Sequence, residues 1–312
     1  MLSNLYIPHL NDNRSAIIRL FGYFAIHFVV TCVLSPLSLR AQPDSSNQFT
    51  FLPPGHSFMP LRAYVQEPRI GLFKFTDDSN MRLDVGNSVD LFQYDIPSSN
   101  LKVTTGIDFM SYSLATGAEG FRLQIDALDG FFGGNIVVAQ GDSVSRWTSR
   151  LRVLHQSAHL VDGDFSYNTS FWTAPEGQIP YTRNYGELVV AHENNSDGMY
   201  FRCYGGVSHA VFVRPADIER NTVLAGFEAA SEKIVSPVLS QPSNLYICYL
   251  TDLSGVRVYT LSHQLQAGIK LGRWYGKGPS FYFEYYTGLS MFSEYFYEHV
   301  RTVGVGFSVD FF

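Results

Sequence analysis

Apolar and polar residues alternate through most of the chain beyond residue 80, and this alternation limits the fold more than any other feature. In the C-terminal segment, one face carries only large apolar residues and the other carries small or polar ones: Val303, Val305, Phe307, Val309 and Phe311 against Gly304, Gly306, Ser308 and Asp310. Successive side chains of an extended chain point to opposite faces, so this pattern predicts a β-strand with one apolar face. Segments 121–128, 258–271 and 280–291 alternate in the same way. We therefore predict an all-β fold.

The first 41 residues are predicted to be a signal peptide and not part of this fold. Arg14 and Arg19 precede an apolar run from residue 20 to 34, which is shorter than the roughly 20 residues of a membrane-spanning helix. Ala41 offers a cleavage site, which completes the pattern of a secretory signal. Lipidation of Cys32 is an alternative, although Thr31 before it is bulkier than such signals prefer.

The composition of this exported chain favours a membrane barrel. It contains 25 Phe, 19 Tyr and 26 Gly, but only 16% of its residues are charged. We therefore predict a transmembrane antiparallel up-and-down β-barrel in the outer membrane of a Gram-negative-type bacterium. A secreted β-sandwich would alternate equally well, but segments of about ten residues suit a barrel better. No basic cluster stands out, so nucleic acid is not an expected partner.

Twelve strands are predicted, and they set the domain boundaries. The predicted strands are 81–94, 101–113, 119–128, 131–140, 145–157, 182–193, 199–213, 222–232, 244–253, 256–271, 279–291 and 299–312. The candidate at 69–75 is excluded, because bacterial single-chain barrels have even strand numbers. Residues 42–80 then form a periplasmic or lumenal lead-in, and residues 81–312 form the barrel.

The orientation of the barrel follows from its last strand, which must run down into the periplasm. The long connection 158–181 is then extracellular, and the short turns 114–118, 141–144 and 194–198 are periplasmic. The last strand ends in Phe311 and Phe312, and we expect the barrel-assembly machinery to recognise it.

The predicted inner face of the barrel carries both signs of charge. Its charged residues include Arg82, Asp84, Arg122, Asp126, Arg150, Arg152 and Glu284. A selective pore should show an excess of one sign. The near balance therefore favours a lumen filled by ion pairs and water, with a small-solute channel or transporter as an alternative.

The stretch HQSAHL at 155–160 places polar residues on the lipid side of a predicted strand. His155 and Ser157 share that face with Leu151 and Val153, while Gln156 points inward. The register of the next strand places Asn184 beside them on the outer wall. A His, a Ser and an Asn could then act together on membrane lipids, which are the expected partner. The alternative is that these residues belong to the polar rim of the barrel.

Two resemblances involve the same region. RLRVLHQSAHLVDGD at 150–164 resembles an arginine-rich strand and His-x-Ser-Ser-His-Leu motif in a family of bacterial outer-membrane proteins, which is known only as a domain of unknown function. Segment 51–69 is similar to the lead-in of that family. This resemblance implies a barrel without implying an activity.

The His-Gln-Ser triplet resembles that of outer-membrane phospholipase A, a twelve-stranded barrel, and the lipid A deacylase barrel has a related His-x-Ser. The resemblance implies a serine esterase with Ser157 as nucleophile, His155 as base and Asn184 as its orienting partner. Ala158 and His159 replace the phospholipase's Asn-Gly, so its calcium ligands do not carry over. No cofactor is expected unless the chain is lipase-like, in which case calcium is the candidate. Asp162 and Asp164 could hold calcium, although such loop carboxylates are more often solvated.

Overall fold

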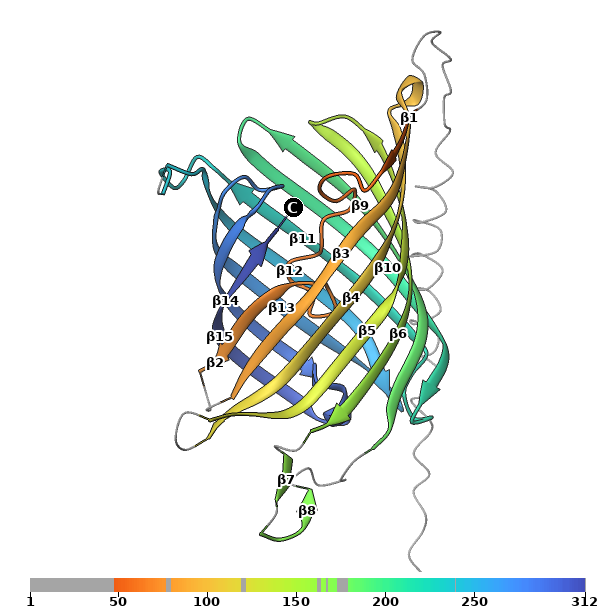
Figure 1. Cartoon of the computed structure of the whole chain (residues 1–312), viewed down its shortest axis with the longest axis vertical. Coiled ribbons are helices and arrows are strands. Elements are labelled where there is room, and N and C mark those ends of the chain that lie inside the picture. Colours follow the sequence, from red (N-terminus) through yellow and green to blue (C-terminus); the bar gives the residue numbers. More distant parts are fainter. Residues whose placement is uncertain are drawn as a thin grey trace, which may run out of the picture. The chain divides into compact units, whose positions relative to one another are not determined.

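Twelve strands form a closed antiparallel barrel in the computed structural model (Figure 1). The structure describes residues 48–76, 80–118, 122–161, 164–166, 168–172, 179–238 and 240–311, without the side chains of residues 118 and 122. The predicted signal peptide 1–41 and Phe312 therefore lie outside the described residues. No helix within the described ranges is long and apolar enough to cross a membrane.

Each wall strand pairs with its neighbours along the chain, and β2 pairs with β15 to close the barrel. The wall strands are β2 (Ile70–Phe75), β3 (Asn80–Ile96), β4 (Leu101–Ala118), β5 (Arg122–Gly141), β6 (Ser145–Leu160), β9 (Tyr181–Ser196), β10 (Met199–Arg214), β11 (Asn221–Ser231), β12 (Ser243–Val256), β13 (Val258–Leu271), β14 (Gly278–Leu289) and β15 (His299–Asp310). The smaller elements are β1 (Gln48–Phe51), β7 (Phe165–Ser166), β8 (Phe171–Trp172) and the 3₁₀ turns η1 (Pro97–Ser99) and η3 (Ser293–Tyr295). We call the end of the barrel that holds Asp310 the inner end and the opposite end the outer end.

The two faces of the wall differ in polarity, as the alternating sequence requires. On β6, Val153 is 65% exposed on the outside, whereas Arg152 next to it is fully buried inside. The outer face elsewhere carries exposed aromatic and branched residues such as Phe132, Phe283 and Val305. An apolar surface of this extent is not tolerated in water but matches the hydrocarbon of a bilayer.

The barrel interior is filled by residues 52–69, which we call the lumenal segment. Figure 1 shows this orange stretch of chain passing inside the barrel between β1 and β2. Phe58, Leu61 and Tyr64 from this segment are buried in the main apolar cluster with inward residues of the wall. From the turn after β13, Trp274 joins the same cluster and lies under the Arg62 guanidinium, 4.6 Å from its ring centroid.

The lumenal segment does not simply precede the barrel, because it connects two strands, β1 and β2, that both pair with β3. β1 pairs with residues 92–95 of β3, and β2 pairs with residues 81–85 of the same strand. The other edge of β3 is paired with β4 over its whole length. β1 and β2 therefore lie along one edge of β3, and the chain leaves the wall between them to fill the lumen.

The connection between β14 and β15, residues 290–298, also folds into the barrel, from the outer end. We call it the inward loop. Its Ser293 backbone N–H donates to Asp129 Oδ2 at 3.0 Å, and its Ser293 hydroxyl accepts from Gln156 Nε2 at 2.8 Å. Tyr112 donates its hydroxyl to the Met291 carbonyl at 2.9 Å. The lumen is thus occupied from both ends.

The prediction of twelve strands is confirmed, but two of its assignments are wrong. Residues 119–128 and 131–140 were predicted as two strands, whereas the single strand β5 covers them from Arg122 to Gly141. The segment 69–75, excluded on parity, is the wall strand β2. The wall therefore begins at Ile70 and not at residue 81, and part of the predicted lead-in belongs to it. The two errors cancel in the count.

Because β2 is the first strand of the wall, β3 and β4 run in the opposite directions to those predicted for segments 81–94 and 101–113. The turn predicted at 114–118 lies near the outer end, because β4 runs to Ala118 on the same side as the 161–180 connection. The turns after β5 and β9 lie at the inner end with Asp310, as the predicted orientation requires.

This topology makes a labelling prediction. A cysteine placed at Ser166, in the connection at the outer end, should react with a membrane-impermeant thiol reagent on intact cells. A cysteine at Ser143, in the β5–β6 turn at the inner end, should react only after the outer membrane is permeabilised. Equal labelling of the two positions on intact cells would contradict the orientation.

Candidate functional site

The outer wall places His155 and Asn184 side by side. The two residues are direct partners across the β6–β9 pair, and both side chains are exposed on the outer face. His155 Nδ1 lies 2.6 Å from Asn184 Oδ1. An amide oxygen only accepts, so this bond requires a proton on Nδ1. In the neutral imidazole, His155 Nε2 then carries the lone pair, which is the tautomer that a general base needs.

Ser157 follows two residues later on the same face and is half-buried. Gly130 lies directly across from it on β5, so no side chain stands directly opposite Ser157 on that strand. The hydrogen bonds of the described side chains include the His155–Asn184 bond but none between Ser157 Oγ and the His155 ring. The structure therefore brings two of the three predicted site residues into contact and leaves the third beside them. Catalytic hydrogen bonds of this kind are often formed only when substrate is bound.

A second His–Asn pair on the outer wall provides a comparison. His209 Nδ1 lies 2.8 Å from Asn221 Oδ1, across the β10–β11 pair, and both residues are exposed. Two residues beyond His209 stands Val211, which cannot act as a nucleophile. A His–Asn pair is thus not unique to the HQS strand, whereas a serine at this spacing distinguishes the pair at His155.

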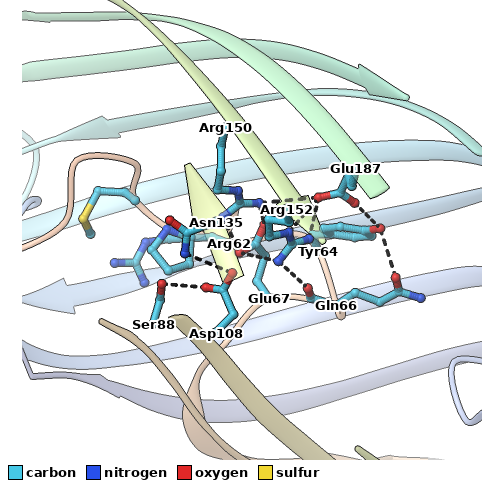
Figure 2. A network of polar contacts seen from close by, with 12 residues as sticks. Arg62, Tyr64, Gln66, Glu67, Ser88, Asp108, Asn135, Arg150, Arg152 and Glu187 are labelled. Atoms are coloured by element: carbon cyan, nitrogen blue, oxygen red, sulfur yellow. Dashed lines mark hydrogen bonds and ion pairs between the residues drawn. The ribbon is translucent and has the colours of Figure 1, made fainter. Parts of the chain in front are cut away.

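The lumen holds a denser polar network, in which the lumenal segment meets the wall (Figure 2). Glu67 accepts from both terminal nitrogens of Arg150, one of them at 3.0 Å, and lies 3.5 Å from Arg152 Nη1. Arg152 Nε donates to Glu187 Oε1 at 2.9 Å, and Tyr64 donates its hydroxyl to Glu187 Oε2 at 3.1 Å. Burial alone would raise the pKa of Glu67, but the two guanidinium groups hold it below its ordinary value.

Further bonds tie the N-terminal half of the lumenal segment to other strands. Arg202 donates to the Met59 carbonyl at 2.8 Å and forms an ion pair with Glu228. The Arg62 backbone N–H donates to Glu228 Oε1 at 2.7 Å, and its guanidinium donates to Asp310 Oδ2 at 2.7 Å. These contacts fix the lumenal segment to β10, β11 and β15, so it is an ordered part of the barrel interior.

Most of the predicted lumen charges lie buried in ion pairs or hydrogen bonds. Arg82 donates to Asp84 and Glu284, and all three are almost fully buried. Asp126 is buried and accepts a hydrogen bond from Thr116. The side chain of Arg122 lies outside the described residues.

Sequence reasoning missed the residues of the lumenal segment that complete this network, namely Arg62, Tyr64, Gln66 and Glu67. They stand in a segment without periodicity, so no strand pattern indicated where they point. The only available signal was the similarity of 51–69 to the lead-in of the family with the same arginine-rich strand.

The acidic pair proposed for calcium is only partly described. Asp162 lies outside the described residues, and Asp164 is buried, with the Tyr295 hydroxyl donating to its Oδ1 at 3.4 Å. Among the described residues, no group of three or more His, Cys, Asp or Glu side chains is arranged to hold a metal ion. Nearby, burial raises the pKa of Glu294 in the inward loop to about 7.

A closed antiparallel barrel with an apolar outer wall and a filled polar lumen is the architecture of outer-membrane barrels. Neither known protein families nor curated protein sequences match this chain, so no family is assigned. Among solved structures, the chain is similar to the β domain of the Bordetella autotransporter BrkA, with 10% identity, 77% of this chain and 98% of that chain covered, and a TM-score of 0.39. It is also similar to the Pseudomonas putida toluene transporter TodX, with 8% identity, 75% and 69% of the two chains covered, and a TM-score of 0.38.

Proposed function

We propose that this chain is an outer-membrane barrel that hydrolyses ester bonds of membrane lipids at its outer wall. Ser157 is the nucleophile, His155 the general base, and Asn184 the residue that orients His155. The single observation that carries the proposal is the 2.6 Å bond between His155 Nδ1 and Asn184 Oδ1, two residues before a serine on the same face. The site points away from the lumen, which favours a substrate that arrives through the lipid layer.

The reaction follows from these roles. His155 Nε2 takes the proton from Ser157 Oγ as that oxygen attacks the carbonyl carbon of the ester. The protonated imidazole then gives its proton to the leaving alcohol oxygen, and an acyl-serine remains. Water, deprotonated by His155, hydrolyses this intermediate and regenerates the serine. Asn184 holds the ring in the required tautomer throughout.

The test is hydrolysis of phospholipid and of lipid A in mixed detergent micelles, with and without calcium. Ser157→Ala and His155→Ala should each lower turnover by roughly 10⁴-fold or more, as in other serine hydrolases. Asn184→Ala should lower it less, because the base itself remains. His209→Ala is the matched control: it removes the other exposed His–Asn pair and should leave turnover unchanged.

Turnover that survives Ser157→Ala would rule out the proposed nucleophile. The absence of ester cleavage by the wild type with every lipid would assign His155 and Ser157 to the polar rim instead.

A second candidate function is the transport of a small solute through the lumen. The observation that favours it is the placement of the lumenal segment, which fills the barrel as a loop held between two strands of the wall. Transport would require this segment to move aside, and the conductance experiment in the Discussion tests it.

A further inference from the structure

A cavity remains in the lumen toward the outer end, between the lumenal segment and the inward loop. Its volume is about 100 Å³. Tyr64 from the lumenal segment, and Met291 and Phe296 from the inward loop, contribute to its lining, together with inward side chains of the wall. The lining also includes Ile218, in the connection between β10 and β11, and Val256, the last residue of β12, so the cavity lies next to the outer opening.

Arg183 on β9 contributes a cation to this cavity, and no described carboxylate lies within ion-pair distance of it. The residue is 8% exposed, and it forms no ion pair with a described carboxylate. Its guanidinium lies over the Tyr185 ring, 4.7 Å from the centroid, and hydrogen-bonds with Tyr181. Its Nε, however, is buried without a hydrogen-bond partner in the described part of the chain.

The other buried arginines of the wall differ from Arg183 in this respect. Each has at least one carboxylate partner, and these are Arg82, Arg150, Arg152 and Arg202. A buried charge normally has a partner, because desolvation of an unpaired ion costs several kcal/mol. The exception at Arg183 therefore indicates a place for an anionic group from outside the chain.

Asp252 on β12 contributes the opposite charge to the same cavity. It accepts a hydrogen bond from the Ser254 hydroxyl at 2.8 Å, and no ion pair joins it to Arg183 or to another described cation. The cavity lining thus holds one guanidinium group, of Arg183, and two carboxylates, of the buried Asp252 and the half-exposed Glu219, and neither described carboxylate forms an ion pair with Arg183. A simple anion would satisfy Arg183 but would be repelled by Asp252, whereas a molecule with both charges satisfies both.

The size and the walls of the cavity restrict the ligand further. One water molecule needs roughly 10–15 Å³ of such volume, so about 100 Å³ accommodates a molecule of roughly seven to ten non-hydrogen atoms. Lipids and oligosaccharides are excluded on this ground. Hydroxyl groups of Ser208, Thr222 and Tyr286 line the remaining wall and can take further hydrogen bonds.

We propose that the cavity binds a small zwitterion of amino-acid size, with its carboxylate on Arg183 and its ammonium group on Asp252. This inference is independent of the hydrolase proposed for the outer wall. It requires a binding site in the lumen that is reached from the outer end.

Isothermal titration of the purified full chain in detergent tests the proposal, with glycine, L-alanine and L-serine as probes. At least one should bind, and acetate and L-alaninamide, which carry one charge each, should bind at least 10-fold more weakly. Arg183→Gln should weaken amino-acid binding at least 10-fold without changing the binding of L-alaninamide. Asp252→Asn should weaken it similarly without changing the binding of acetate. Arg257→Gln, on the exposed outer rim, is the control and should change nothing.

The comparison of probes on the wild type does not depend on any variant being folded. The proposal is overturned if none of the three amino acids binds, or if acetate binds as tightly as they do. Binding that is unchanged in Arg183→Gln would also overturn it.

Discussion

Glu67→Ala is expected to destabilise the barrel by about 3–5 kcal/mol, the cost of removing one partner from a buried ion pair. Glu67 is 2% exposed and accepts hydrogen bonds from Arg150, and Arg152 lies within ion-pair distance. Removing its carboxylate leaves two buried guanidinium groups to share Glu187 alone. The measurement is the free energy of unfolding in guanidinium chloride, followed by intrinsic fluorescence in detergent.

A matched control comes from an exposed ion pair at the outer rim. Asp217 and Arg257 are bonded at 2.6 Å, but both side chains are exposed, by 45% and 77%. Exposed pairs contribute little, so Asp217→Ala should change the free energy of unfolding by less than about 1 kcal/mol. Replacing Glu67 and Arg150 together by Leu and Met should recover part of the loss, because no unpaired carboxylate or guanidinium is added. A loss for Glu67→Ala no larger than that for Asp217→Ala would contradict the packed network.

The wild-type chain is expected to show little or no steady conductance in planar bilayers, whereas a variant without residues 42–69 should form open channels. The physical reason is that residues 52–69 fill the lumen, with Phe58, Leu61 and Tyr64 in its apolar cluster. Their removal leaves a polar interior that water and ions can enter. Single-channel recording measures the difference.

The deletion must first be shown to leave a folded barrel. Heat-modifiable migration in SDS gels reports this, because the wall from β2 to β15 is retained in the variant. Large, steady channels in the wild type would contradict a sealed lumen and would favour a transport function. A folded variant that fails to conduct would show that the inward loop alone closes the barrel.

The barrel itself was predictable because its wall repeats one simple pattern. A period of two with an apolar face determines the direction of each side chain. The hydrogen-bonded register then determines which residues of neighbouring strands lie opposite one another. The contact of His155 with Asn184 follows from that rule alone, since the two are direct neighbours across two strands. Sequence reasoning therefore placed two members of the outer-wall site in contact.

The split of β5 into two predicted strands has an identifiable cause. The middle of β5 has the composition of a turn, because it contains Asp129, Gly130, Gly133 and Gly134. In the structure, Asp129 instead accepts the Ser293 backbone N–H at 3.0 Å. Gly133 stands where a Cβ would lie 2.0 Å from the Val153 carbonyl oxygen, so its glycine permits close approach of β6. Both residues serve contacts with other segments, which a local pattern cannot reveal.

The filling of the lumen could not be predicted from the sequence, for a related reason. Glu67 and Arg150 are 83 residues apart in the chain, and the segment that holds Glu67 has neither a strand nor a helix period. Charge balance on the inner face predicted compensating ion pairs. It could not show that some of the partners, such as Glu67, come from the lumenal segment and not from the neighbouring strand.

The break between β1 and β2 determines how the lumenal segment could leave the barrel. Its N-terminal side is held by four residue pairs on the edge of β3, whereas its C-terminal side continues into β2, between β3 and β15 in the closed wall. A short pairing at an exposed edge opens at much lower cost than a closed wall. The lumenal segment is therefore held strongly at its C-terminal end, by β2, and weakly at its N-terminal end, by β1. The weak end lies at the inner end of the barrel. A pulling force applied to the chain at Gln48 should separate β1 from β3 first, and the ion pairs of Arg62 and Glu67 would then have to break before the segment could leave the lumen.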